Sequence, residues 1–226
     1  ELVELATQNN LVVMENFMFL YHSQQTYVKG EIDSGLIGDV RCFRSSFGFP
    51  PLSRDNIRYK KELGGGSLLD VGAYPIRASQ MFLGGSLSVS AATLFVDPQL
   101  DVDIFGGAFL ANNAGLFSEI AFGFDNFYQC NYEIWGSLGK ITVSRAFTAG
   151  PDFLPQVTVE HQGKERKAEL PTDNHAKNML REFSHAIKNQ EKRIRFYGEI
   201  IDQAKIIHDV RVKANRVTEN IHARFN

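Results

Sequence analysis

The sequence has little cysteine, little net charge and no long apolar run, and each shortage excludes a class of protein. Only two residues are cysteines, Cys42 and Cys130, too few for a disulfide framework or a four-cysteine zinc site. A net charge of -2 gives no basic surface for nucleic acid or an acidic membrane. No apolar run approaches the roughly 20 residues that cross a bilayer. We therefore expect a cytoplasmic protein without a metal, nucleic acid or a membrane among its partners.

The first 17 residues indicate the end of an α/β unit. The apolar spacing in ELVELA is typical of a helix, Asn9 and Asn10 end it, and LVVMENF follows as a strand-like run. No capping residue or initiator methionine precedes the helix. We therefore expect a chain cut from a longer protein. Residues 1–17 would be the tail of a preceding domain, and residues 18–226 the domain that follows.

Helix and strand signals continue around a glycine run. The pattern predicts a helix over residues 23–34 and a strand over 39–49. After a polar loop, the run GGG leads into a helix over 67–83, whose first half should be disturbed by Pro75 because proline has no amide donor. Helical periodicity returns from residue 173 to about 217.

Between these helices the pattern is strand after strand, separated by short turns such as Asp125-Asn126. Seven strands are predicted at about residues 87–96, 101–111, 115–124, 127–135, 140–147, 156–162 and 165–171. Short turns between successive strands imply antiparallel neighbours. The predicted fold class is α+β, with a large, mostly antiparallel, open-faced sheet and helices on one face.

The other face of this sheet should also meet something, because the strands carry more aromatic bulk than one helical layer needs. The residues are Phe105, Phe109, Phe117, Phe122, Phe124, Phe127 and Trp135. An exposed apolar face usually marks a partner surface. We expect self-association through it, as a homodimer or tetramer. A thicker single core is the alternative.

The stretch DNIRYKKELGGGSLLDVGAYPIR carries the strongest chemical signal. Asp70, Tyr74 and Arg77 are spaced i, i+4 and i+7, which places them on one face if the segment is helical. A phenol there is a plausible proton donor if a nearby cation lowers its pKa. The three adjacent glycines indicate either close approach of the backbone to a ligand or a tight turn. The alternative role of Asp70 is a helix-start carboxylate, with Tyr74 half-buried.

Motifs that bind phosphate or metal are missing. The chain has no G-x-G-x-x-G fingerprint, no P-loop and no paired-histidine metal spacing. Its six histidines are scattered. His22 and His175 stand near element boundaries, where site residues are common, and we take His175 as a candidate for substrate binding against a plain surface role.

Three stretches resemble the glucose-fructose oxidoreductase/inositol dehydrogenase (Gfo/Idh/MocA) family. They are ENFMFLYHSQ with KGEIDSGLIGDVRCFRSSF, then DNIRYKKELGGGSLLDVGAYPI, and finally NMLREFSHAI with FYGEIIDQAKIIHDV. The second is the most specific and is similar to the xylose and dihydrodiol dehydrogenase branch. The resemblance covers nearly the whole chain and identifies it as the substrate-binding, C-terminal part.

The resemblance implies hydride transfer between NAD or NADP and a sugar or sugar nucleotide. It implies that Tyr74 is the general acid/base, that Asp70 orients the reacting groups, and that Arg58 lies near the substrate pocket; Arg77 is a further candidate there. Residues 1–17 would be the remnant of a Rossmann domain. That domain would hold the cofactor, its glycine fingerprint and a catalytic lysine, so this chain alone should be inactive.

The sequence departs from the family pattern at several positions. Leu20 and Ser23 stand where the branch usually shows arginine and proline, and Lys60 and Lys61 stand near the expected pocket mouth. The two lysines suggest an anionic substrate such as a nucleotide-linked sugar, or else they are ordinary solvated lysines. A non-catalytic, ligand-sensing relative of the same fold is the alternative function.

Overall fold

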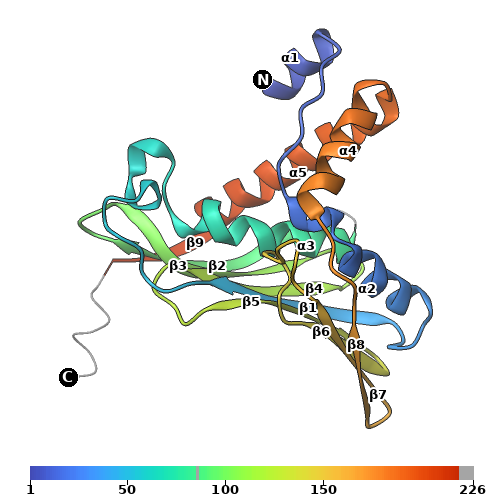
Figure 1. The fold of residues 1–226 in the computed structure, drawn as a ribbon. Coiled ribbons are helices and arrows are strands. Elements are labelled where there is room, and N and C mark those ends of the chain that lie inside the picture. Colours follow the sequence, from blue (N-terminus) through green and yellow to red (C-terminus); the bar gives the residue numbers. More distant parts are fainter. Residues whose placement is uncertain (85–86, 219–226) are drawn as a thin grey trace, which may run out of the picture.

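One nine-stranded sheet organises the chain, with strand order β8-β7-β6-β5-β1-β4-β3-β2-β9 (Figure 1). The computed structural model describes residues 1–84 and 87–218, so the end of the predicted domain 18–226 lies outside the described residues. The strands are β1 (Val40–Gly48), β2 (Ser88–Asp97), β3 (Val102–Ala111), β4 (Phe117–Gly123), β5 (Gln129–Gly136), β6 (Gly139–Val143), β7 (Gln156–His161), β8 (Lys164–Glu169) and β9 (Ala214–Val217). The α+β class is confirmed. The sheet is mixed, because β1 pairs with β4 and β2 with β9 in parallel, while the other neighbours within the described ranges are antiparallel.

The position of β1 overturns one expectation. A short turn joins β4 to β5, but the two strands are not neighbours, because β1 lies between them. Phe47 on β1 pairs with Phe122 on one side and with Cys130 on the other. Two strand spacings amount to about 10 Å, which the five residues between β4 and β5 easily span. A short turn therefore does not require adjacent strands.

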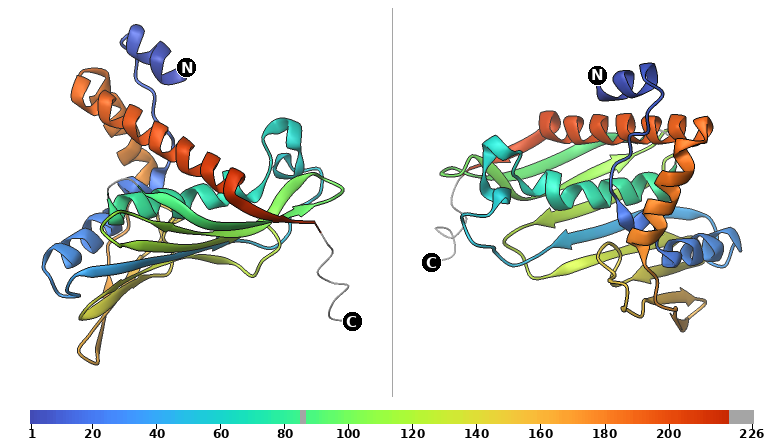
Figure 2. Two further views of the ribbon diagram at one scale, coloured as in Figure 1. Left: turned by 180° about the vertical axis from the view of Figure 1, so that it is seen from behind. Right: turned by 45° about the horizontal axis from the view of Figure 1, so that its top comes forward.

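Helices cover one face of the sheet and leave the other open (Figures 1 and 2). The helices in the described part of the chain are α1 (Leu2–Gln8), which stands away from the sheet, α2 (Ser23–Asp33), α3 (Ala73–Leu83), α4 (His175–Ile187) and α5 (Gln190–Lys213). Short 3-10 turns are η1 (Met18–Tyr21), η2 (Ile57–Tyr59) and η3 (Lys61–Leu63), and η4 (Leu68–Gly72) is a π-turn. α3 packs on β1 and β4, and α5 packs on β2. Within the described residues no helix is long and apolar enough to cross a membrane.

Two segments differ from their predicted structure. Residues 11–17 form no strand, because an extended segment needs a neighbour to complete a hydrogen-bond ladder. Instead, α5 holds the start of this segment: Arg193 donates to the Asn10 side chain at 2.6 Å, and the Tyr197 hydroxyl donates to the Leu11 carbonyl. The last predicted helix stops at Lys213, and residues 214–217 pair with β2 as an edge strand.

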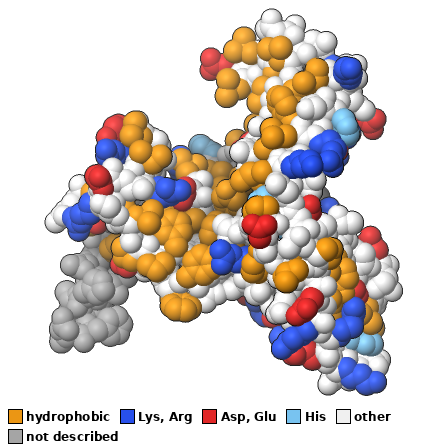
Figure 3. Space-filling view, in the orientation of Figure 1, with side chains coloured by type: hydrophobic (Ala, Val, Ile, Leu, Met, Phe, Trp, Pro, Cys, Tyr) orange, Lys and Arg blue, Asp and Glu red, His pale blue; other side chains and the backbone are white. Residues whose placement is uncertain are grey.

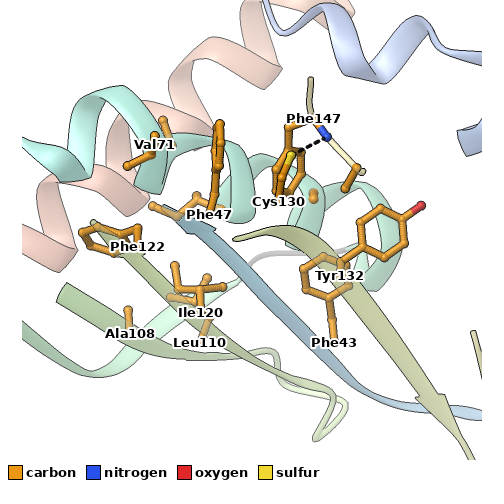
Figure 4. Packing of buried hydrophobic residues seen from close by; sticks show 14 of the residues in the cluster. Phe43, Phe47, Val71, Ala108, Leu110, Ile120, Phe122, Cys130, Tyr132 and Phe147 are labelled. Atoms are coloured by element: carbon orange, nitrogen blue, oxygen red, sulfur yellow. Dashed lines mark hydrogen bonds between the residues drawn. The ribbon is translucent and has the colours of Figure 1, made fainter. Parts of the chain in front are cut away.

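The core lies between the sheet and the helical layer. Figure 4 shows Val71 of the π-turn close to Phe47 and Phe122 of the strands. Phe122 and Phe124 are 3% and 0% exposed, so these two of the counted aromatic residues belong to this core. Gln203 on α5 is fully buried and donates to the Ala73 carbonyl at 2.8 Å, which fixes α5 to the start of α3.

The open face of the sheet carries stacked aromatic rings. Phe95 stacks on Phe105 with ring centroids 4.9 Å apart, and Phe109 stacks on Phe117 at 5.2 Å. Trp135 is 49% exposed and lies under the Arg44 guanidinium, 5.0 Å from its carbon. Arg44 in turn pairs with Glu119 and Glu133. This face is therefore partly apolar and partly charged.

Candidate active site

The glycine run packs against the chain that carries Arg58. The Gly65 amide donates to the Lys60 carbonyl and the Gly66 amide to the Arg58 carbonyl, both at 2.9 Å. A Cβ on Gly65 would lie 2.5 Å from the Arg58 oxygen and 2.8 Å from the Lys60 oxygen. Of the two roles predicted for the glycines, the structure accounts for the tight turn. The close approach is to the protein's own backbone.

The helix that follows begins with the predicted disturbance. Residues Leu68–Gly72 form one π-turn, and regular α-helix starts at Ala73. Pro75, which has no amide donor, lies in the first turn of α3, directly after the π-turn. Single π-turns inside helices are frequent at functional sites. Here the π-turn carries Asp70, and Tyr74 follows in the first turn of α3.

The structure joins two of the predicted site residues directly. Arg58 Nε donates to Asp70 Oδ2 at 2.7 Å, and both side chains remain partly exposed, at 36% and 29%. The Arg58 guanidinium also reaches the Asn56 side chain at 3.4 Å and lies over the Phe49 ring. Arg58 and Asp70 therefore form one fixed polar pair with a face open to solvent.

Phenylalanine rings surround the side chain of Tyr74. Its ring lies 5.1 to 5.9 Å from the ring centroids of Phe17, Phe19, Phe47 and Phe147, several of them edge-on. Within residues 1–84 and 87–218 its hydroxyl makes no hydrogen bond, and Tyr74 as a whole is partly exposed. Burial raises the pKa of Tyr74, the Asp70 charge adds to this, and the Arg58 charge opposes it. These surroundings favour the neutral phenol.

The surface over this region is concave. Figure 3 shows a hollow between the lobe of residues 55–66 and the lobe formed by α1, α4 and α5, with hydrophobic side chains on its walls. In Figure 1, α3 runs between the same two lobes. The helix that bears Tyr74 therefore lies where a ligand could enter from one side.

Arg77 has a different setting. Its guanidinium pairs with Glu199 of α5 at 2.6 Å and donates to Gln80 at 3.3 Å. With Glu199 and Tyr21 it lines a separate cleft of about 580 Å³ between α3 and α5. The structure thus brings Arg77 to α5, whereas Asp70 pairs with Arg58. The part of Arg77 in substrate binding stays a prediction.

His175 packs on another histidine. Its ring meets that of His22 edge-on, with centroids 5.7 Å apart. His22 Nδ1 accepts from the Gln24 amide at 3.1 Å, and both His22 Nε2 and His175 Nδ1 are buried without a partner. Asp173 lies alongside and accepts from the Ser23 amide at 2.7 Å. Sequence reasoning did not pair these histidines, because 153 positions separate the two in the chain. The role of His175 in substrate binding stays a prediction.

The two lysines of the loop differ in their surroundings. Lys61 forms an ion pair with Asp101 in the turn between β2 and β3. Lys60 is half-buried and forms no ion pair with any residue that the structure describes. At most one of the two charges is thus available to an anionic ligand. Among the described residues no three His, Cys, Asp or Glu side chains gather in a way that would hold a metal ion.

An open mixed sheet with one layer of helices over it defines the chain as an α+β fold. Residues 26–142 match the GFO/IDH/MocA C-terminal domain, and the chain belongs to this family. The resemblance drawn from the motifs is thereby confirmed.

The most similar relatives share one enzyme name. The chain is 36% identical over 96% of its length to a dTDP-3,4-didehydro-2,6-dideoxy-alpha-D-glucose 3-reductase of Actinomadura kijaniata, and 38% identical over 83% of its length to the reductase of that name in Saccharopolyspora spinosa. It spans 65% and 56% of the lengths of these relatives. The crystal structure of a 3-ketoreductase from Actinomadura kijaniata with NADP and TDP-benzene superposes with a TM-score of 0.92 at 35% identity, covering 96% of this chain and 67% of that one.

The buried histidine pair should make stability depend on pH. Burial lowers the pKa of His22 and His175 below 6.5, against the opposing charge of Asp173. The unfolded chain then binds more protons, so this contribution is fully present above about pH 6.5 and is lost as pH falls through the folded pKa values. We expect the free energy of unfolding in urea to fall between pH 7 and 5, and His175→Gln to flatten that fall.

His208→Gln, on the exposed side of α5, is the matched control and should keep the wild-type slope. An unchanged slope in His175→Gln would contradict the role of the pair.

Proposed function

We propose that this chain is the substrate-binding part of an NADP- or NAD-dependent oxidoreductase that acts on a keto sugar linked to a nucleotide. The observation that carries the proposal is the partly exposed Tyr74, with its neutral phenol, beside the Arg58–Asp70 pair. Membership of the GFO/IDH/MocA family and similarity to dTDP-sugar 3-reductases support it. The reaction class follows from what such a phenol can do for a carbonyl.

Reduction of a ketone places negative charge on its oxygen. A donor must therefore stand within hydrogen-bond reach of that oxygen and give it a proton. Tyr74 suits this step, because its raised pKa keeps the proton on the phenol until charge develops. Asp70 and Arg58 orient the sugar hydroxyls next to the reacting carbon. After the phenol has given up its proton, the phenolate that remains needs a cation near it at neutral pH until a proton returns. In the family this cation would be the upstream lysine.

A bound nicotinamide supplies the hydride. The sequence holds no phosphate-binding fingerprint, so no residue of this chain is assigned to the cofactor. We propose that residues 1–17 belong to the preceding dinucleotide-binding domain and that this domain holds NAD or NADP. The chain on its own would then bind substrate and leave it unreduced.

Replacing the phenol is the direct test. In the complete protein, Tyr74→Phe should lower kcat by about 100- to 10,000-fold, because the developing oxyanion loses its proton donor. The KM for the cofactor should not change. Steady-state kinetics with NADPH oxidation as the readout measure both.

Tyr27→Phe removes a phenol on α2 that bonds Arg166, and it should leave kcat unchanged. If Tyr74→Phe also retained full activity, the proposal that Tyr74 acts in catalysis would fail. The alternative, a ligand-sensing relative of the same fold, would then be favoured.

Substrate class can be tested separately. We expect the complete protein to turn over a dTDP-linked keto sugar with a kcat/KM at least about tenfold above that of the same sugar without the nucleotide, with Lys60 contributing a charge to the diphosphate. Comparing the two substrates at low and high salt measures this contribution. A preference for the neutral sugar would contradict the proposal.

We also propose that two copies associate through the open sheet face. Phe109 is 37% and Trp135 is 49% exposed, and neither meets the helical layer. Phe109→Arg combined with Trp135→Arg should halve the mass in analytical ultracentrifugation, because two charges would be buried at the contact. Leu180→Arg on α4 is the control and should leave the mass unchanged. A wild-type protein that sediments as a monomer would refute the contact.

A further inference from the structure

A carboxylate from the sheet holds the start of the π-turn. Asp103 on β3 accepts from the Leu68 amide at 2.6 Å and from the Ser67 hydroxyl at 2.8 Å, both through Oδ2. Leu68 is the first residue of the π-turn, where an amide has no partner within the helix. Ser67 is fully buried, so its hydroxyl depends on this carboxylate. Asp103 thus caps the turn from a distant part of the sequence.

The same carboxylate touches the glycine run. A Cβ on Gly66 would overlap the Asp103 carboxylate, and Gly66 adopts a φ of 118°, which side-chain-bearing residues rarely adopt. The Gly66 amide meanwhile donates to the Arg58 carbonyl at 2.9 Å. One carboxylate therefore contacts the segment that leads to Asp70 and also the glycine that is bonded to Arg58.

We propose that Asp103 is a positioning residue for Tyr74 and for the Arg58–Asp70 pair. This rests on the proposed function. Asp103 touches none of the reacting groups, and it acts by fixing residues 66–68, from which Asp70 follows two residues later and Tyr74 six. Displacing a catalytic group by about 1 Å can cost about 100-fold in rate, so a lost cap at this point would be visible in kcat.

The test is a double-mutant cycle in the complete protein. Asp103→Ala should lower kcat by about 10- to 100-fold with the cofactor KM unchanged. Asp103→Asn should lose less, because its amide oxygen can still accept from the Ser67 hydroxyl and the Leu68 amide although the charge is gone. In the Tyr74→Phe background, Asp103→Ala should cause a clearly smaller further loss than it does alone, since the part of its effect that passes through the phenol is already gone. Asp125→Asn, in the exposed turn after β4, is the matched control and should keep wild-type kcat.

Two results would overturn the role: an unchanged kcat in Asp103→Ala, or losses that multiply in the double variant, as they would for general destabilisation. If Asp103→Ala does not fold, Asp103→Asn carries the same cycle. A second measurement tests the positioning role independently of the reaction.

The titration of the Tyr74 phenol can be followed by NMR of 13C-labelled tyrosine, with the signal assigned by its loss in Tyr74→Phe. Its pKa should shift in Asp103→Asn and not in Asp125→Asn. If Tyr74→Phe retains full activity, the proposed function fails, and an unshifted titration would then overturn the positioning role as well.

Discussion

The hydrogen bonds from Gly65 and Gly66 to the carbonyls of Lys60 and Arg58 are the constraint on which the site depends. They bind the loop before the glycines to the helix after them, and they require a backbone without Cβ atoms at the contact. The ion pair of Arg58 with Asp70 forms across this junction. Without the close backbone approach, the two charges would belong to independent segments, and a half-exposed ion pair contributes too little to bring such segments together.

The surroundings of Tyr74 decide which protonation state of its phenol is favoured. The surrounding phenylalanines remove water from the ring and disfavour the phenolate, and the carboxylate of Asp70 acts in the same direction. Among the residues that the structure describes, only Arg58 opposes them, and it is already paired with Asp70. The domain therefore favours a neutral phenol. Any step that needs the phenolate would have to bring positive charge from outside it.

The parts of the site that the sequence predicts are those set by local spacing. Asp70 and Tyr74 lie four residues apart on one helical segment, and the disturbance before Pro75 follows from the chemistry of proline. The contacts that sequence reasoning missed depend on distant segments: His22 against His175, Arg77 against Glu199, and β9 against β2. No local pattern encodes which strand lies between β4 and β5. An aromatic count does not say which side of a strand each ring takes: Phe122 and Phe124 are buried in the core, whereas Phe109 and Trp135 are exposed.

The insertion of β1 between β4 and β5 also has a kinetic consequence. Phe47 and Phe122, which are register partners at the centre of the sheet, are separated by 75 positions in the chain. Strands β2, β3 and β4 can pair locally as hairpins. The middle of the sheet forms only when β1, which lies far upstream in the chain, pairs with β4, and such long-range pairing is slow. The segment that bears Asp70 and Tyr74 lies inside the loop that this pairing closes. The arrangement of Asp70 and Tyr74 therefore depends on this long-range pairing, and a nascent chain cannot complete it until β4 has been synthesised.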